Sequence, residues 1–342
     1  MQQSTKPPRL RRGDTVGIVS PSFGGAGLFP HRAEAGVRRV EALGFRTRVG
    51  AHALNHSGYV SDTPENRAAD LHDMFRDPEV RAIVAAIGGD HSCQLLPLLD
   101  FDVIRANPKI FMGYSDNTVL NMAFWKGAGL VSFNGPALLT DFAEQPEMFE
   151  YTERYMLKVL CEAQPAGAVE PSAWWTEEFQ DWNRKLDLQQ PRARVPSPGR
   201  TCLKPGRSEG TLIGGCLESL QHLRGTRFWP DAGDWQGAIF FWETSEDKPS
   251  PAVVDGMLMD YENMGVLERL GGMIVGRPMY YTDEEKAQVR DIILERTKKY
   301  SFPVVTGMDF GHTAPQMTLP VGCLARIDGE SGQFEIVEAA VR

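Results

Sequence analysis

Long apolar runs and paired cysteines are missing from this sequence, and each absence argues against a class of protein. No apolar run approaches the roughly 20 residues that span a bilayer. The apolar stretch at 16–19, behind a basic N-terminal segment, is too short for a signal peptide, so we expect a cytosolic protein. The five cysteines are odd in number and form no Cys-x-x-Cys pair, which argues against a disulfide framework or a zinc knuckle. We expect them to be small buried hydrophobic residues.

An excess of basic residues is missing as well. The net charge is −9, from 45 acidic and 36 basic residues, and the basic residues gather only in short patches such as 9–12. This balance argues against a nucleic-acid polymer as partner. Hydrophobic residues make up 42% and charged residues 24%, as in soluble globular proteins. The length of 342 residues predicts two domains.

The first half of the chain alternates short apolar runs with amphipathic segments. The apolar runs at 15–20, 82–87, 109–114 and 131–133 predict strands, and the segments at 31–43, 64–75, 95–99 and 117–126 predict helices. This alternation predicts βαβ units and a parallel sheet. Functional residues of such sheets lie on the loops that follow the strands, which here are 21–27, 88–92 and 115–117.

The second half divides into an irregular segment and an ordered one. Residues 163–210 have no hydrophobic periodicity but contain three tryptophans, so a long functional loop or linker is expected. Beyond it, strands are expected at 238–242, 273–275, 304–306, 317–320, 323–327 and 334–337, and helices at 251–264 and 282–299. We therefore expect a Rossmann-like α/β domain at 1–165, a tryptophan-bearing loop at 166–210, and a mixed α/β domain with small β-barrel character at 211–342.

The sequence Phe-Met-Gly-Tyr-Ser-Asp-Asn-Thr at 111–118 places a serine in a sharp strand-to-helix turn. Such a turn presents the Ser115 hydroxyl outside the sheet, as in the nucleophile elbow of α/β hydrolases, although Asn117 replaces the second glycine of that motif. The backbone N–H of Asp116 would face a developing oxyanion at the helix N-terminus. The same residues would also serve as ordinary helix caps.

Two further motifs complete a catalytic hypothesis. Gly88-Gly89-Asp90 follows the neighbouring predicted strand and would bring a second N–H, that of Gly89, to the oxyanion, or else form only a tight turn. Among seven histidines, His312 lies in a glycine-flanked loop after a predicted strand, a position typical of a catalytic base. Glu243 ends an apolar strand and would either orient that base or form a structural ion pair.

The order of these motifs resembles that of the LD-carboxypeptidases, also called muramoyltetrapeptide carboxypeptidases. The resemblance covers nearly the whole chain and includes the segments 13–21, 88–90, 113–118, 214–217, 276–278 and 311–313. It implies a serine peptidase with Ser115 as nucleophile, His312 as general base, Glu243 as its orienting carboxylate, and the amides of Gly89 and Asp116 as oxyanion hole. It further implies a homodimer that needs no metal or other cofactor.

Two branches of the family differ in substrate. One removes the terminal D-alanine of murein tetrapeptides, and the other, the microcin C immunity branch, cleaves the amide between an aminoacyl group and a nucleotide. The tryptophan-rich segment 174–182 and the segment 243–251 resemble the second branch. We expect Trp175 and Trp182 either to stack on a nucleobase or to pack the loop onto the domain.

Asp90 and Cys216 are also expected to contact the substrate. Cys216 stands in Gly-Gly-Cys-Leu where the resemblance predicts an asparagine, and a thiol is a weaker hydrogen-bond donor. The expected partner is thus a small peptide or aminoacyl-nucleotide, with no membrane involved. A non-catalytic small-molecule binding protein is the alternative outside the hydrolases.

Overall fold

The computed structural model describes residues 4–342 and places a six-stranded sheet in the N-terminal half. The strand order is β14-β5-β4-β3-β1-β2, and every pairing is parallel except that of β14. Its strands are β1 (Thr15–Val19), β2 (Arg46–Val49), β3 (Val80–Ala85), β4 (Ile110–Met112), β5 (Ser132–Asn134) and β14 (Leu319–Val321). The predicted Rossmann-like parallel sheet is therefore confirmed.

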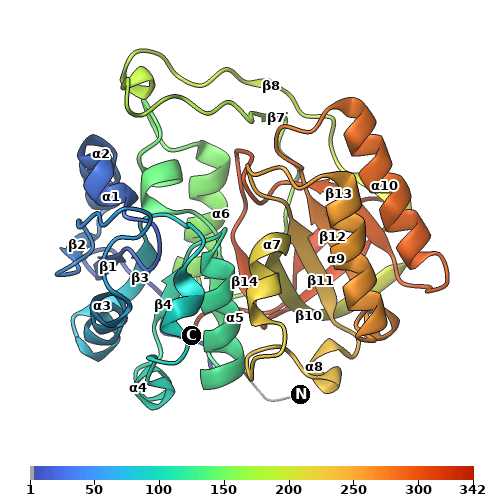
Figure 1. Ribbon diagram of the computed structural model, residues 1–342, viewed down its shortest axis with the longest axis horizontal. Coiled ribbons are helices and arrows are strands. Elements are labelled where there is room, and N and C mark those ends of the chain that lie inside the picture. The colour runs from blue at the N-terminus through green and yellow to red at the C-terminus, as the bar shows by residue number, and fades with distance from the viewer. Residues whose placement is uncertain (1–3) are drawn as a thin grey trace.

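Helices flank this sheet on the left of Figure 1, and local sequence explains where they begin and end. The side chain of Thr63 accepts a hydrogen bond from the N–H of Asn66 and Pro64 occupies the first turn, which starts a helix. Gly129 adopts the left-handed conformation that ends another. The helices of this half are α1 (Gly25–Leu28), α2 (Pro30–Ala42), α3 (Pro64–Arg76), α4 (Phe101–Ala106), α5 (Asn117–Ala128) and α6 (Glu150–Cys161).

The C-terminal half is built on an eight-stranded mixed sheet with the order β6-β16-β15-β10-β11-β12-β13-β9. Its centre, β10 to β13, is parallel, while the first half of β10 pairs antiparallel with β15. In this order, strand pairing among residues 4–342 does not close into a ring. The strands are β6 (Gly167–Ala168), β9 (Thr201–Lys204), β10 (Arg207–Cys216), β11 (Ile239–Glu243), β12 (Gly272–Gly276), β13 (Val304–Met308), β15 (Leu324–Asp328) and β16 (Gln333–Ile336).

Helices α9 (Pro251–Asn263) and α10 (Asp283–Thr297) contact each other and cover this second sheet in Figure 1. The predicted capping box of α10 is confirmed, because Thr282 accepts from the N–H of Glu285 and the Glu285 carboxylate accepts from the N–H of Thr282. Two short helices, α7 (Leu217–Leu220) and α8 (Ala232–Trp235), follow β10. The sequence did not predict the central strand β10, nor β2, α1, α4, α6, α7, α8 and the short strands of the middle segment. The helix expected at 95–99 is a 3-10 turn at Ser92–Leu95.

The two halves share strands and one hydrophobic core. The late strand β14 pairs antiparallel with β5 of the first sheet, while β6 and β9 of the middle segment join the second sheet. Buried hydrophobic residues of both sheets form one contiguous cluster. Each sheet therefore takes an outer strand from a different part of the chain than its central strands.

We refer to residues 171–200 as the strap. It contains the short paired strands β7 (Trp174–Trp175) and β8 (Val195–Pro196) and crosses the top of Figure 1 above both halves. Two buried or half-buried arginine pairs hold it. Arg32 Nη1 lies 3.0 Å from Asp187 Oδ2, and Arg192 Nη2 lies 2.6 Å from Glu144 Oε2. The expected long loop is therefore anchored at defined positions.

The remaining sequence expectations concern membranes and cysteines. Among the helices of residues 4–342, none combines the length and apolar content that crossing a membrane requires. Cys216 and Cys323 are buried, as expected, and Cys93 and Cys161 are half-buried, but Cys202 is exposed because it lies on the edge strand β9. The prediction of buried cysteines was wrong at that position.

Candidate active site

Ser115 lies in the turn between β4 and α5 with a backbone φ of 61°. A non-glycine residue seldom adopts this left-handed conformation, which costs on the order of 1–3 kcal/mol and persists only when the surroundings hold it. The side chain of Asn117 supplies such support by donating hydrogen bonds to the carbonyl oxygens of Tyr114 (3.0 Å) and Ile87 (3.2 Å). The turn has the form expected of a nucleophile elbow.

Glycine is required where neighbouring backbone approaches this turn. A Cβ built on Gly88 would lie 2.8 Å from Ser115 Oγ, and one built on Gly113 would lie 2.9 Å from Asn117 Cγ. Either side chain would displace the serine or its support. The loop after β3 is thus held against the Ser115 hydroxyl.

Glu243 and His312 meet at the end of β11. Glu243 is 1% exposed, and its Oε2 accepts hydrogen bonds from His312 Nδ1 at 2.7 Å and from the His312 backbone N–H at 3.3 Å. Gly311 makes this approach possible, since its φ is 102° and a Cβ there would lie 2.5 Å from Glu243 Oε2. The Nδ1 bond leaves Nε2 as the nitrogen available to a substrate or nucleophile.

Charge around His312 favours its protonated form. Burial by itself would lower the pKa of His312, but the Glu243 carboxylate, its hydrogen bond, and the charges of Glu246 and Glu218 raise that pKa to about 9. Glu246 lies in the loop after β11, with its Oε2 3.1 Å from His312 Nε2. The ring of Tyr114 packs edge-on against the imidazole at 5.1 Å between centroids.

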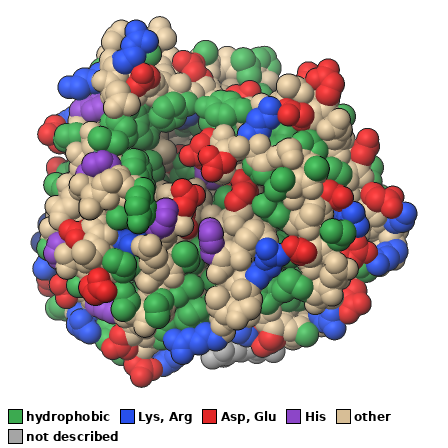
Figure 2. Space-filling model, viewed as in Figure 1, with side chains coloured by type: hydrophobic (Ala, Val, Ile, Leu, Met, Phe, Trp, Pro, Cys, Tyr) green, Lys and Arg blue, Asp and Glu red, His purple; other side chains and the backbone are tan. Residues whose placement is uncertain are grey.

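Ser115 and His312 line one cavity of about 670 Å³. In Figure 2 hydrophobic and acidic side chains border a hollow on this face. A cavity of this size, mostly apolar with a few polar groups, is typical of small-molecule sites. Other residues that line it are Phe23, Phe29, Arg32, Tyr59, Gly88, Gly89, Asp90, Tyr114, Asp141, Glu144, Glu178, Trp182, Arg192, Glu246, Tyr280 and Gln316.

The residues predicted for the oxyanion hole lie on the two loops that meet at Ser115. Gly89 has a φ of 133° and packs closely against Ser22 and Phe23. The Asp116 carboxylate is fully buried and accepts a hydrogen bond from the Ser92 N–H at 2.8 Å, and burial raises its pKa. The assignment of their amides to an oxyanion stays a prediction.

The two predicted stacking tryptophans lie in different cavities. Trp182 lines the cavity of Ser115; its ring is 7% exposed and contacts the Arg32 guanidinium at 4.7 Å and the Phe29 ring at 5.3 Å. Trp175 lines a second cavity of about 330 Å³, which Glu243 also lines, and the cations of Arg277 and Lys286 lie 5.8 and 5.6 Å from its ring. Only Trp182 is therefore brought together with the serine and histidine.

Of the two other residues predicted to contact the substrate, Asp90 lies at the cavity and Cys216 does not. Asp90 is exposed and lines the cavity. Cys216 is buried at the end of β10, its N–H donates to Thr118 Oγ1 at 2.9 Å, and burial raises the pKa of its thiol well above the usual value. Cys216 is not among the residues that line either cavity in the described part of the chain.

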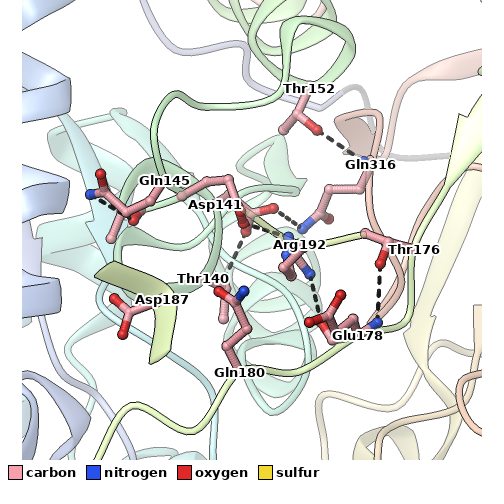
Figure 3. Close-up of polar contacts among 12 residues, drawn as sticks. Thr140, Asp141, Gln145, Thr152, Thr176, Glu178, Gln180, Asp187, Arg192 and Gln316 are labelled. Atoms are coloured by element: carbon pink, nitrogen blue, oxygen red, sulfur yellow. Dashed lines mark hydrogen bonds and ion pairs between the residues drawn. The ribbon is translucent and has the colours of Figure 1, made fainter. Parts of the chain in front are cut away.

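Several functional candidates escaped the sequence analysis. Asp141, from a turn of π-helix, accepts from Gln316 Nε2 at 2.9 Å, and the N–H of Gln316 donates to Thr152 at 3.0 Å, as Figure 3 shows. Asp141, Arg192 and Gln316 are far apart in the sequence and form one polar wall of the cavity, with Thr152 behind Gln316. Only Glu246 carried a local signal, its place in the loop directly after Glu243.

Comparison with known proteins places this geometry in context. Residues 16–135 match the LD-carboxypeptidase N-terminal domain, and residues 209–327 match the LD-carboxypeptidase C-terminal domain. The chain is 30% identical over 331 residues to the microcin C7 self-immunity protein MccF of Escherichia coli, covering 96% of this chain and 94% of that protein. It is 30% identical over 339 residues to a probable murein peptide carboxypeptidase of Bacillus subtilis (strain 168), covering 98% and 95%. A structure of MccF in complex with aspartyl sulfamoyl adenosine superposes with a TM-score of 0.91 at 30% identity, covering 99% and 100% of the two chains.

Proposed function

Because these matches show that the chain belongs to the LD-carboxypeptidase family, we propose that it is a serine hydrolase that cleaves the amide between an aminoacyl group and a nucleotide. Ser115, His312 and Glu243 are proposed as its catalytic triad. The observation that carries the proposal is the strained Ser115 on the cavity that also holds His312, whose Nδ1 is bonded to the buried Glu243.

In the first half of the proposed reaction Ser115 Oγ attacks the carbonyl carbon, and its proton passes to His312 Nε2. The carbonyl oxygen gains the negative charge, to which the N–H groups of Gly89 and Asp116 donate. When the intermediate collapses, the C–N bond breaks and His312 returns its proton to the leaving nitrogen. An ester between the acyl group and Ser115 remains.

The second half hydrolyses that ester. A water attacks the ester carbonyl and gives one proton to His312 Nε2. The bond to Ser115 Oγ then breaks and His312 protonates the serine. The products are the carboxylic acid and the released amine, and Glu243 holds the imidazole in one orientation throughout.

The strap supports the nucleotide part of the proposal. Its Trp182 lines the cavity but is covered by Arg32 and Phe29, and the exposed ring of Phe179 lies beside it at 5.1 Å between centroids. A base stacked on an aromatic ring gains about 1–3 kcal/mol, and Phe179 offers such a ring at the cavity. The relative MccF has been captured with aspartyl sulfamoyl adenosine in a structure that covers nearly the whole chain. Trp175, in the second cavity, would contribute only by packing the strap.

Removal of a terminal D-alanine from murein tetrapeptides is the second candidate. It is favoured by the similarity to a probable murein peptide carboxypeptidase. The cytosolic location and the homodimer stay predictions, and light scattering of the purified protein would measure the latter.

The test is a paired hydrolysis assay with the wild-type protein and Ser115→Ala. Each would meet an aspartyl-adenosine conjugate with a scissile amide and a murein tetrapeptide ending in D-alanine. We expect cleavage of the conjugate and a loss of at least about 10³-fold in Ser115→Ala, by analogy with other triads. Cleavage of the tetrapeptide alone would establish the second candidate. Binding of either compound without serine-dependent turnover would make this a binding protein.

A further inference from the structure

His312 lies between two carboxylates. Glu243 Oε2 accepts from Nδ1 at 2.7 Å, and Glu246 Oε2 lies 3.1 Å from Nε2. The two acids differ in setting, because Glu243 is buried at the end of β11 while the Glu246 side chain is 59% exposed and lines the catalytic cavity. Glu246 is therefore free to move, whereas Glu243 is fixed.

The contact with Glu246 opposes the first catalytic step. A general base must accept the Ser115 proton at Nε2, which requires a free lone pair on that nitrogen. A carboxylate at Nε2 stabilises the imidazolium, which has no such lone pair. Glu246 must leave Nε2 before the reaction begins.

A displaced Glu246 carboxylate that stays in the cavity while a ligand excludes water from it needs another positive partner, and the neighbouring cations are already paired. Arg32 is bound to Asp187 at 3.0 Å and Arg192 to Glu144 at 2.6 Å. Lys248, two residues along the same loop, is bound to Glu285 at 2.8 Å. The cavity also holds the carboxylates of Asp90, Asp141 and Glu178, which would repel Glu246. The positive partner must therefore come with the ligand.

The position of the cation in the ligand follows from the chemistry of the acyl group. Attack requires the carbonyl carbon about 3–3.5 Å from Ser115 Oγ, and Oγ must itself reach Nε2. A carboxylate 3.1 Å from Nε2 is then within reach of the groups bonded to that carbonyl carbon, of which the α-carbon is the one that can carry a cation. In an aminoacyl conjugate that carbon bears a free α-ammonium group, whereas in a murein tetrapeptide the corresponding nitrogen is acylated and neutral.

We propose that Glu246 is a specificity-determining residue that binds the free α-ammonium group of an aminoacyl substrate and thereby releases His312 Nε2 for catalysis. The inference rests on the proposed function and narrows it to substrates with an unblocked amino group. An N-acylated substrate would leave Glu246 on His312 and would be processed slowly.

The decisive experiment measures binding in the Ser115→Ala background, so that it does not depend on turnover. Aspartyl sulfamoyl adenosine and its N-acetyl derivative would be titrated calorimetrically into Ser115→Ala and into Ser115→Ala with Glu246→Gln. We expect Glu246→Gln to weaken the free-amine compound at least about 10-fold, equivalent to 1.4 kcal/mol, and to change the N-acetyl compound less than about two-fold. The control is Asp247→Asn, which removes the adjacent exposed carboxylate of the same loop outside the cavity.

The role of Glu246 would be overturned if Glu246→Gln weakened the binding of both compounds equally, or changed the binding of neither. It would also be overturned if Asp247→Asn caused the same loss of affinity for the free-amine compound. Such results would leave the proposed function standing, because that is decided by the loss of turnover in Ser115→Ala. Conversely, a protein that binds the free-amine compound through Glu246 but turns nothing over would retain the ammonium-binding role of Glu246 and would lose both the hydrolase and the release of His312 for catalysis.

The pH profile gives an independent readout in the active protein. The charged and titratable groups that face His312 are Glu243 from β11, Glu246 from the following loop, Glu218 from α7 and Tyr114 from the end of β4. Since neutral His312 is the base, kcat/KM should fall as the pH drops below its pKa. Glu246→Gln removes one charge that raises this pKa, so the midpoint should move to lower pH, and less so at high salt, which screens an exposed carboxylate. An unchanged midpoint would contradict the contact.

Discussion

At the scale of single residues, catalytic geometry depends on positions where only glycine fits. Gly88 lets the loop after β3 touch Ser115, and Gly311 lets the histidine loop touch Glu243. Neither contact involves a functional side chain on the glycine itself. The positions of the proposed triad residues therefore depend on glycine backbone that approaches them so closely that no methyl group would fit between.

This leads to a prediction for Gly311→Ala. A Cβ at a φ of 102° is strained and would lie 2.5 Å from Glu243 Oε2, so the carboxylate must shift away from His312. We expect a loss of about 1–3 kcal/mol in the free energy of unfolding, measured in urea, and a fall in kcat of at least about 10-fold.

Gly256→Ala is its matched control. Gly256 lies inside α9, and a Cβ at this position would meet no atom within 4 Å, so the same substitution should stabilise the protein by about 0.5–1 kcal/mol and leave kcat unchanged. If Gly311→Ala behaved like Gly256→Ala, the close approach of Gly311 to Glu243 would be wrong.

At the scale of elements, the strap is held by charge and aromatic contacts instead of long strands. Arg32, from α2, is 3% exposed; it pairs with Asp187 and lies under the ring of Trp182. Burial lowers the pKa of Arg32, while Asp187 opposes that effect. One arginine thus fixes both the strap and the aromatic wall of the cavity.

Arg32→Met should loosen the strap, because it leaves the buried carboxylate of Asp187 without its guanidinium partner. Removing one member of a buried ion pair costs about 3–5 kcal/mol. We expect faster trypsin cleavage within 184–194 and a higher KM for the aminoacyl-nucleotide. Arg38→Ala on the same helix, whose partner Glu34 is equally exposed, should change neither measurement. A strap as resistant in Arg32→Met as in the wild type would show that other contacts hold it.

At the scale of the whole molecule, the halves are joined by exchanged strands. β14 follows β13 in the chain yet pairs with β5 of the first sheet. The residues Gly311 to Ala314 and Gln316, just before it, line the catalytic cavity. Thr118 of α5 accepts from the Cys216 N–H, and Gly215 packs directly on that threonine. Such interlocking predicts that the halves unfold together.

Equilibrium unfolding in urea should therefore give coincident transitions by far-UV circular dichroism and by tryptophan fluorescence. Leu319→Ala in β14, where the side chain is fully buried, should lower both midpoints together, at a cost of about 2–5 kcal/mol. Two separated transitions, with only one moved by Leu319→Ala, would indicate independent domains.

Local sequence patterns were sufficient to predict the first parallel sheet, the capped helices such as α10, and the loops that carry Ser115, Glu243 and His312. These features follow from local periodicity, turn residues and the order of motifs, all of which are written within short segments. Tertiary structure alone decided which groups face His312, that Trp182 and not Trp175 shares the cavity with Ser115, and that Cys216 is turned into the core. It also decided that β14 completes the first sheet. These contacts join residues that are far apart in the chain, and local patterns carry no information on which distant surfaces will meet.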